Sequence, residues 1–180
     1  MIYIVNGCPS AGKTTFESIV AEKLGEAWCL MLSTAELPKQ IATQLGWNGL
    51  KTSKDRKFLS DLKKLLTEWN DLPIKYIKQE INNYYTEITQ YGLNFFNKTV
   101  IFIDCREPDE IDRLCRELGA KSICIRNHAA EAINEKMALN DSDRNILNYK
   151  YDIEISNDGT LEDLRQAVDL FIKQEISQHI

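Results

Sequence analysis

The segment GCPSAGKT, residues 7–14, constrains the fold more than any other part of the chain, because it joins the apolar run IYIVN to a helical pattern that starts at Lys13. Glycines in a GxxxxGKT pattern let the backbone turn its N–H groups inward around phosphate oxygens. The helix that follows adds its positive end, the lysine reaches the β- and γ-phosphates, and the threonine hydroxyl binds Mg²⁺. The sequence therefore predicts a phosphate-binding loop between a strand and a helix.

We assign this loop and the first helical turn to a nucleoside triphosphate, with Thr14 on the metal and Thr15 as a further phosphate contact. A motor, a switch, a kinase and a nucleotide sensor can all contain such a loop, so the rest of the chain must narrow the choice. The predicted contacts are Gly7, Ser10, Ala11, Gly12, Lys13, Thr14 and Thr15.

Short apolar runs alternate with helix-like segments along the chain. The middle runs are apolar on both faces, as strands covered by helices on two sides require. This alternation predicts a parallel sheet in a three-layer α/β domain. The expected strands are Ile2–Asn6, Trp28–Leu32, Thr99–Asp104, Ser122–Arg126 and Tyr151–Ser156.

Two longer segments interrupt the alternation. The first follows the second strand and has helical periodicity, which predicts an inserted helical lobe rather than a loop. The second precedes the last strand. We therefore expect a single domain with core segments 1–33, 98–126 and 150–180, a helical insert at 34–97 and a lid at 127–149. One helix of the insert should bury Phe58, Leu62, Leu65, Leu66 and Trp69 on a common face.

The composition is typical of a globular domain and excludes several classes of protein. The chain has 180 residues, of which 43% are hydrophobic and 27% charged, as in an ordinary single domain. Its net charge of −5 offers no global attraction to nucleic acid, so no such partner is expected. No apolar run approaches the roughly 20 residues of a membrane span, and the chain opens with a strand rather than a secretory leader.

The cysteines indicate a reducing environment. Their number, five, is odd, and no two of them have the close CxxC spacing of a metal or redox motif. Unbridged, buried thiols are the simplest interpretation, and they are typical of cytoplasmic proteins. We therefore expect a cytoplasmic location.

A second Mg²⁺ ligand and phosphate-binding cations are expected where strands end, because ligands bind at the carboxyl ends of strands in open α/β sheets. Asp104 closes the run VIFID and could hold the Mg²⁺ shell; alternatively, it caps the next helix. The planar fork of arginine suits bidentate phosphate binding. Three arginines have suitable positions: Arg56 in the insert, Arg106 past one strand and Arg126 at the end of the next.

Other uses of a phosphate loop fit the sequence less well. A GTP-dependent switch needs an NKxD sequence, whereas the NKTV at residues 97–100 lacks the aspartate and precedes a strand. An oligomeric ATP-driven machine usually needs a longer chain with an arginine-bearing lid domain. The small size and the two interruptions favour a small-molecule kinase, which must close over two substrates to exclude water.

With these residues assembled, the chain resembles phage-type deoxynucleoside monophosphate kinases and their nucleoside-monophosphate-kinase-like bacterial relatives. The loop GCPSAGKTT is similar to their GxPGxGK loop, and DCREPDE (104–110) is similar to a DVRFPNE-like segment at a strand end. Residues 45–63 resemble the monophosphate side, and residues 140–164 resemble the passage from lid to last strand. The resemblance implies a P-loop kinase fold with a five-stranded parallel sheet in the order 2-3-1-4-5.

The resemblance also implies roles for the matching residues on the donor side. Lys13 and the loop would hold the ATP phosphates, and Asp104 would serve the magnesium or the acceptor side. Arg126 and Arg144 would act from the lid. The adenine would be flanked by Asn157 and Gly159. The expected catalytic residues are Lys13, Asp104, Arg106 and Arg126.

On the acceptor side, the resemblance implies that Arg56 and Arg106 grip the acceptor phosphate. Ser33 and Thr34 end the second strand, where an acceptor could contact them; a helix N-cap is an equally good interpretation. Two departures leave questions open. Ser10 stands where the family's loop has a glycine, which leaves the loop geometry open, and residues 45–63 match only in part, which leaves the acceptor base open.

We therefore expect an ATP- and Mg²⁺-dependent phosphotransferase that acts on a nucleoside monophosphate, with a deoxynucleotide as the favoured acceptor. The alternatives are a P-loop kinase of another small metabolite and an ATP-binding regulator without catalytic activity. Arginines at strand ends favour the enzyme, because a sensor needs no grip on an acceptor phosphate. The oligomeric state stays open, and a dimer is compatible with the sequence.

Overall fold

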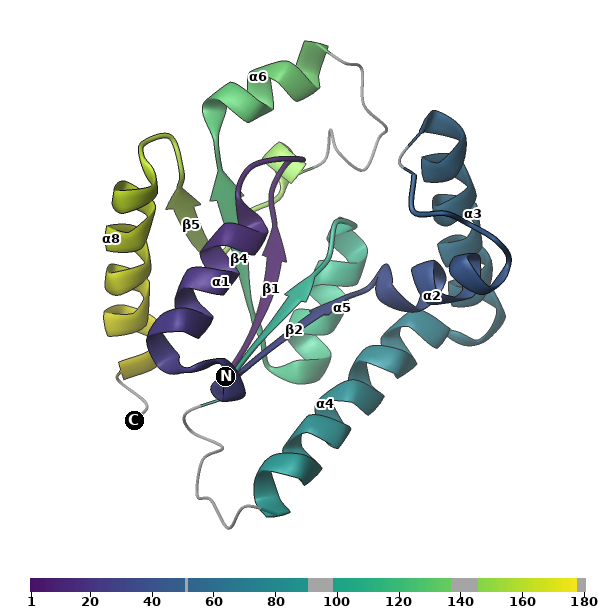
Figure 1. The fold of residues 1–180 in the computed structure, drawn as a ribbon, viewed down its shortest axis with the longest axis horizontal. Coiled ribbons are helices and arrows are strands. Elements are labelled where there is room, and N and C mark those ends of the chain that lie inside the picture. Colours follow the sequence, from purple (N-terminus) through teal and green to yellow (C-terminus); the bar gives the residue numbers. More distant parts are fainter. Residues whose placement is uncertain (51, 91–98, 137–145, 178–180) are drawn as a thin grey trace. The chain divides into compact units, whose positions relative to one another are not determined.

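The computed structural model describes residues 1–50, 52–90, 99–136 and 146–177, and its centre is a five-stranded sheet (Figure 1). The strand order is β2-β3-β1-β4-β5. β1 pairs in parallel with β3 and β4, and β4 pairs in parallel with β5. The predicted three-layer α/β fold and its strand order are confirmed. The strands are β1 (Ile2–Asn6), β2 (Cys29–Ser33), β3 (Val100–Asp104), β4 (Lys121–Arg126) and β5 (Ile153–Ser156).

The chain divides into two compact units, which are described separately. The first comprises Met1–Met31 and Asn94–Ile180, and the second Leu32–Leu93. The helices of the first are α1 (Lys13–Leu24), α5 (Pro108–Leu118), α6 (His128–Lys136) and α8 (Leu161–Phe171), with the short turns η1 (Glu26–Trp28), η3 (Ile146–Asn148) and η4 (Ile172–Ile176). The helices of the second are α2 (Glu36–Gln44), α3 (Ser53–Asn70) and α4 (Leu72–Gln90).

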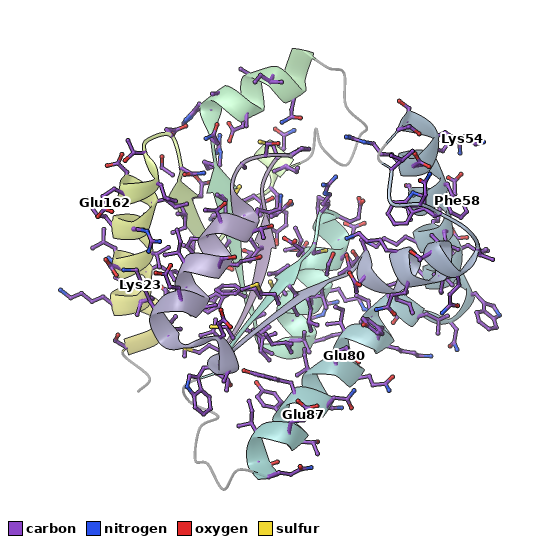
Figure 2. The ribbon with its side chains drawn as sticks, viewed as in Figure 1. Lys23, Lys54, Phe58, Glu80, Glu87 and Glu162 are labelled. Atoms are coloured by element: carbon purple, nitrogen blue, oxygen red, sulfur yellow. The ribbon has the colours of Figure 1, made fainter. Side chains whose placement is uncertain are left out.

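An aromatic cluster forms the core between one face of the sheet and the pair α1 and α8. The ring of Phe171 on α8 lies 5.1 Å from the ring of Tyr3 and 5.3 Å from that of Phe16, both in edge-to-face geometry. Phe16 also meets Phe102 of β3 at 5.9 Å. Such edge-to-face pairs add to the free energy gained from burying their area. Lys23 of α1 and Asp169 of α8 extend the contact to the surface with an ion pair of 2.7 Å, and Figure 2 labels Lys23.

The opposite face of the sheet carries α5, which packs against β1 and β4. Side chains alternate along a strand, so Ile4 and Ile103 point away from the aromatic cluster and are fully buried. On α5, Ile111 and Leu114 are fully buried as well. Helices therefore cover both faces, which explains why the central strands are apolar on both sides.

The second unit is a small helical unit in which α2, α3 and α4 pack pairwise. Its core includes Leu66 of α3 and Ile77 of α4. The sequence predicted that Leu65 and Trp69 share the buried face of Leu66, but these two side chains are 62% and 75% exposed. The helix therefore buries a narrower stripe than its apolar residues suggest, and Phe58 is also exposed (Figure 2).

Among the described residues, no helix combines the length and apolar character needed to cross a membrane. The five cysteines form no disulfide.

The N-terminus of α8 offers a test of how the last helix is anchored. The Thr160 side chain accepts a hydrogen bond from the Asp163 backbone N–H, and the Asp163 carboxylate accepts one from the Thr160 N–H at 2.7 Å. We expect Thr160→Ala to lower the free energy of unfolding by about 1 kcal/mol, because the cap is lost. Thermal and urea unfolding measure this. The control is Thr86→Ala, whose hydroxyl bonds the Asn82 carbonyl within α4, and an equal loss in both variants would contradict the capping role.

Candidate active site

The predicted phosphate loop connects β1 to α1 and uses glycine at two strained positions. Gly7 has φ 148° and Gly12 has φ 97°, values that L side chains rarely adopt. A Cβ at Gly7 would lie 2.5 Å from the Ile125 carbonyl oxygen of β4. At Gly7 the loop backbone therefore passes too close to β4 for any side chain. The packing of the loop against the sheet thus requires the first glycine of the pattern.

Ser10 lies at the exposed crest of the loop with φ 66°. This left-handed conformation is the one a glycine would adopt most easily, and a side chain there costs about 1–2 kcal/mol. At Ser10 the backbone therefore has the conformation typical of glycine, the residue that the monophosphate kinases resembled by this chain have at this position. The serine adds strain while keeping that geometry.

Asparagine side chains from two later segments hold the loop carbonyls. Asn157, after β5, donates from its Nδ2 to the Ala11 carbonyl at 2.8 Å. Asn134, on α6, donates to the Pro9 carbonyl at 3.0 Å. Because these bonds occupy carbonyl oxygens, they help to fix which way the peptide groups of the loop face.

Asn6 fixes the point where β1 ends and the loop begins. It is 1% exposed, and its Oδ1 accepts a hydrogen bond from the Gly7 N–H at 2.8 Å. Its Nδ2 donates to the Tyr151 hydroxyl at 2.8 Å and lies 3.4 Å from the Arg106 carbonyl oxygen. Asn6 therefore links the loop to the segments that follow β3 and precede β5. The sequence prediction missed it; the available signal was an amide at the last position of a buried strand.

Three predicted residues meet beside the loop: Lys13, Asp104 and Arg106. Lys13 Nζ donates to the Gly7 carbonyl at 2.9 Å and lies 3.5 Å from the Cys8 carbonyl oxygen. Burial lowers the pKa of the Lys13 ammonium, the Asp104 carboxylate opposes this, and Arg106 adds to it. These charges are thus close enough to act on one another at the carboxyl ends of β1 and β3, where Asp104 is half-buried and Arg106 exposed.

A fourth charged group, Glu17, joins this cluster and was missed by the sequence prediction. It follows Lys13 by one turn of α1 and is only 4% exposed. Burial, and then the charge of Asp104, raise the pKa of the Glu17 carboxyl to about 8, while Lys13 opposes the rise. The signal in the sequence was an acidic residue at helical spacing from the loop lysine, next to the buried Phe16.

The oxygen donors of this site suit Mg²⁺. Thr14 offers a hydroxyl in the exposed first turn of α1, where Thr15 is exposed as well, and Asp104 offers a carboxylate. Within the described ranges, no cluster of three or more His, Cys, Asp or Glu could hold a metal alone. Mg²⁺ in phosphotransfer sites is usually held by one or two carboxylates together with substrate phosphates, so the donor set fits that ion.

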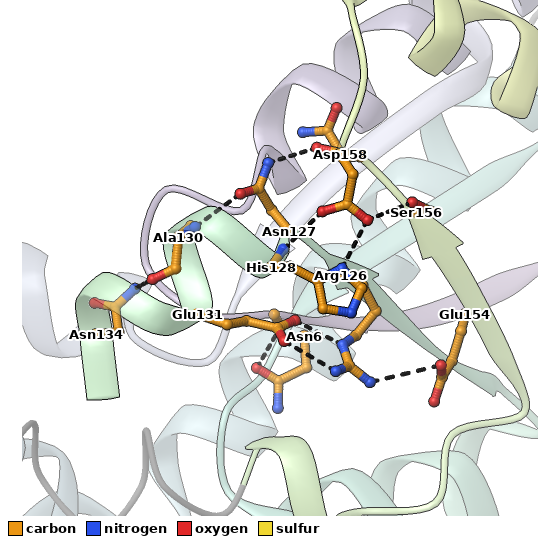
Figure 3. Close-up of polar contacts among 12 residues, drawn as sticks. Asn6, Arg126, Asn127, His128, Ala130, Glu131, Asn134, Glu154, Ser156 and Asp158 are labelled. Atoms are coloured by element: carbon orange, nitrogen blue, oxygen red, sulfur yellow. Dashed lines mark hydrogen bonds and ion pairs between the residues drawn. The ribbon is translucent and has the colours of Figure 1, made fainter. Parts of the chain in front are cut away.

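Arg126, predicted to act from the lid side, lies at the end of β4 and forms an ion pair with Glu131 (Figure 3). Its Nε and Nη2 donate to the two carboxylate oxygens of Glu131 at 2.6 and 2.9 Å. Its Nη1 lies 3.7 Å from Glu154 Oε2. The hydrogen bond to Glu131 raises the pKa of the Arg126 guanidinium and lowers that of the Glu131 carboxyl. The pair ties α6 to β4. Arg144, the other lid arginine, lies outside the described residues.

The segment after β5, predicted to flank the adenine, is ordered by its own hydrogen bonds (Figure 3). The Asp158 carboxylate accepts from the His128 N–H at 2.7 Å and from the Ser156 hydroxyl at 2.8 Å, and the His128 ring Nδ1 lies 2.8 Å away. These contacts, led by the His128 N–H, lower the pKa of Asp158 to about 2. A Cβ on Gly159 would lie 2.4 Å from Asp163 Oδ2, so the glycine makes room for the cap of α8.

The predicted acceptor residues Ser33, Thr34 and Arg56 belong to the second unit. The Ser33 hydroxyl accepts a hydrogen bond from the Ala35 N–H at 3.2 Å, so it closes a turn before α2. Thr34 is 3% exposed and accepts from Lys63 Nζ at 3.0 Å. Arg56 is exposed in the first turn of α3. Within this unit, the structure brings Thr34 to Lys63 on α3, a contact the sequence did not indicate.

Comparison with known proteins supports the fold. A structure described as a "putative kinase" from Chloroflexus aurantiacus is 14% identical, with a TM-score of 0.52 over 96% of this chain and 95% of that one. The chain has a P-loop kinase fold.

Two further solved structures are similar at lower TM-scores. Dephospho-CoA kinase from Campylobacter jejuni is 22% identical, with a TM-score of 0.46 over 98% of this chain and 97% of that one. Thymidylate kinase from Ehrlichia chaffeensis is 14% identical, with a TM-score of 0.46 over 96% of this chain and 97% of that one. No family model and no curated protein matches the chain.

The strained Ser10 gives a prediction with a definite sign. We expect Ser10→Gly to raise the free energy of unfolding by about 0.5–1 kcal/mol, because relief of left-handed strain exceeds the entropy that glycine adds to the unfolded chain. Chemical denaturation measures this. The control is Ser18→Gly at an exposed position of α1, where glycine should destabilise the helix by about 0.5 kcal/mol. A loss of stability in Ser10→Gly would show that the serine side chain itself supports the loop.

Proposed function

We propose that this chain transfers the γ-phosphoryl group of ATP to a nucleoside monophosphate with the help of Mg²⁺, and that a deoxynucleoside monophosphate is the preferred acceptor. One observation carries the proposal: the phosphate loop and its Lys13 lie at the carboxyl edge of the sheet, where β3 ends in Asp104 and the chain continues to Arg106. Phosphoryl transfer depends on positioning and on fixed charges that stabilise a spread negative charge. A cluster of two cations and a carboxylate next to the loop supplies both.

On the donor side, the loop amides and the N-terminus of α1 would bind the β- and γ-phosphates. Lys13 would exchange its hydrogen bond to the Gly7 carbonyl for the phosphate oxygens, which are stronger acceptors because they are charged. Thr14 and Asp104 would hold Mg²⁺, which when bound neutralises charge on the phosphates. Asn157 would support the adenine side while it holds the Ala11 carbonyl.

On the acceptor side, Arg106 would bind the acceptor phosphate through its guanidinium fork. The Arg106 side chain is exposed, and its backbone carbonyl oxygen lies 3.4 Å from Asn6 Nδ2. Arg126 would contribute only after its bidentate pair with Glu131 opens, since both carboxylate oxygens now accept from its guanidinium. We place Ser33, Thr34 and Arg56 on the acceptor side as well, from the resemblance of residues 45–63 and from the exposure of Arg56.

Kinase action on another small metabolite remains the second candidate, and one observation favours it. Asp104 is a carboxylate at the reacting end of the loop, where it could take the proton of an acceptor hydroxyl. A monophosphate acceptor is already ionised and needs no such base. The chemistry of the acceptor therefore separates the two candidates.

An ADP-release assay tests the proposed reaction most directly. The full chain is incubated with ATP and Mg²⁺ and with a panel of ribo- and deoxynucleoside monophosphates, shikimate and dephospho-CoA. We expect stimulation by at least one monophosphate and loss of that stimulation in Lys13→Ala. Stimulation by a hydroxyl acceptor alone would support the second candidate. ATP binding without release for any acceptor would contradict both and favour a regulator.

Arg106 provides the sharpest mutational test of the acceptor site. We expect Arg106→Ala to raise KM for the acceptor or lower kcat by about 10²-fold or more, because one preorganised charge is lost. Steady-state kinetics with varied acceptor measure this. The matched control, Arg116→Ala, removes an exposed arginine in the last turn of α5 and should leave both constants unchanged. An unaltered acceptor dependence in Arg106→Ala would assign Arg106 a structural role.

A further inference from the structure

Glu17 is a buried carboxylate to which the proposed reaction assigns no role. It is 4% exposed and lies on the face of α1 that also buries Phe16, Ile19 and Val20. In the described part of the chain, its carboxylate makes no hydrogen bond and no ion pair within 4 Å. Burying a carboxyl without such partners costs free energy, so its retention calls for a physical reason.

A salt bridge to Lys13 would be the simplest reason, because the two residues are four apart on one helix. The ammonium of Lys13 instead donates to the Gly7 carbonyl at 2.9 Å and lies 3.5 Å from the Cys8 carbonyl oxygen. Glu17 therefore acts on Lys13 only as a charge at a distance. An anchoring role for the lysine does not explain the carboxylate.

The charged group that acts most strongly on Glu17 is another acid, Asp104. They belong to neighbouring elements: Glu17 lies in the second turn of α1, next to Phe16, whose ring is 5.9 Å from that of Phe102 on β3. Asp104 ends β3, level with Val5 of β1. Two carboxylates close together in a buried site repel one another unless a cation lies between them. A divalent cation would turn this repulsion into a favourable interaction.

We propose that Glu17 is a positioning residue of the Mg²⁺–ATP site, where its carboxylate supplies a second negative charge, besides Asp104, for the cation bound by Thr14 and the phosphates. This inference rests on the proposed function in one respect only, namely that the loop binds ATP with Mg²⁺. Thr14 and Glu17 are three apart on α1, a spacing that places their side chains on neighbouring positions of one helix side. Magnesium keeps several waters in such sites, and a carboxylate outside its direct shell orients them.

The test measures how much Mg²⁺ strengthens ATP binding, which needs no turnover. Isothermal titration gives Kd for ATP with Mg²⁺ and with EDTA in the wild-type chain and in Glu17→Gln. We expect the Mg²⁺-dependent gain in affinity to fall by about 10-fold or more in Glu17→Gln, as for other groups that orient metal-bound water. Affinity for ATP in EDTA should stay unchanged, because no cation is then present for Glu17 to act on.

Glu22→Gln is the matched control. Glu22 lies on the same helix, is exposed and pairs with Arg165 of α8, so its loss should leave the gain from Mg²⁺ unchanged. Thermal unfolding without ligand verifies that Glu17→Gln folds, and its Tm should equal or exceed that of the wild type. Glu17→Asp retains the charge on a shorter side chain and should retain more of the gain than Glu17→Gln.

The outcomes separate this inference from the proposed reaction. If Glu17→Gln folds and keeps the wild-type gain from Mg²⁺, Glu17 is not part of the metal site. If Glu17→Gln fails to fold, Glu17→Met removes the charge with an apolar side chain of similar size, and an unchanged gain in Glu17→Met overturns the inference in the same way. A reduced gain in a chain that phosphorylates none of the panel would support Glu17 while rejecting the kinase. A wild-type chain that binds no ATP would reject both.

Discussion

The hydrogen-bond ladder that holds β1 between β3 and β4 is the interaction on which the candidate site depends. Its parallel register sets Val5 beside Asp104 and Asn6 beside Cys124, so three strands end at one edge. Because the loop leaves β1 at that edge, Asp104 and the residues that follow it lie beside the loop. Because a Cβ at Gly7 would lie too close to the Ile125 carbonyl oxygen, only glycine fits at the start of the loop.

The polar contacts around the loop satisfy its backbone N–H and C=O groups, while charged side chains lie at the edge of the sheet. Asn134 and Asn157 bind loop carbonyls, and Asn6 binds the first loop amide. The charged groups Lys13 and Glu17 are by contrast held in an environment that disfavours their ionised forms, as the directions of their pKa shifts show. A site that keeps opposite charges partly desolvated is prepared to gain from an anionic ligand and its cation.

The sequence was sufficient to predict the fold and the loop, since both depend on local signals. Alternating apolar runs indicate strands covered on both faces, and GxxxxGKT specifies strand, loop and helix together. Asp104 was predictable because it ends such a run. Asn6 and Glu17 were not predictable, because their importance comes from interactions with Tyr151 and Asp104, which are far away in the sequence. The exposure of Trp69 was missed for a related reason: helical periodicity shows which residues share a face, but not how wide a stripe the neighbouring helices cover.

Hydrogen–deuterium exchange across residues 7–17, with and without ATP and Mg²⁺, tests the central claim that this loop is a preformed triphosphate site. Within the loop, the Gly7 amide donates to Asn6 Oδ1 and the Ala11 amide to the Cys8 carbonyl. The other loop amides are those expected to bind phosphate, so nucleotide should slow exchange across this segment strongly, while peptides from β1 and β4 change little. We expect this localised protection, and we expect Lys13→Ala to abolish it. Equal exchange with and without nucleotide, at ATP concentrations up to the millimolar range found in cells, would contradict it.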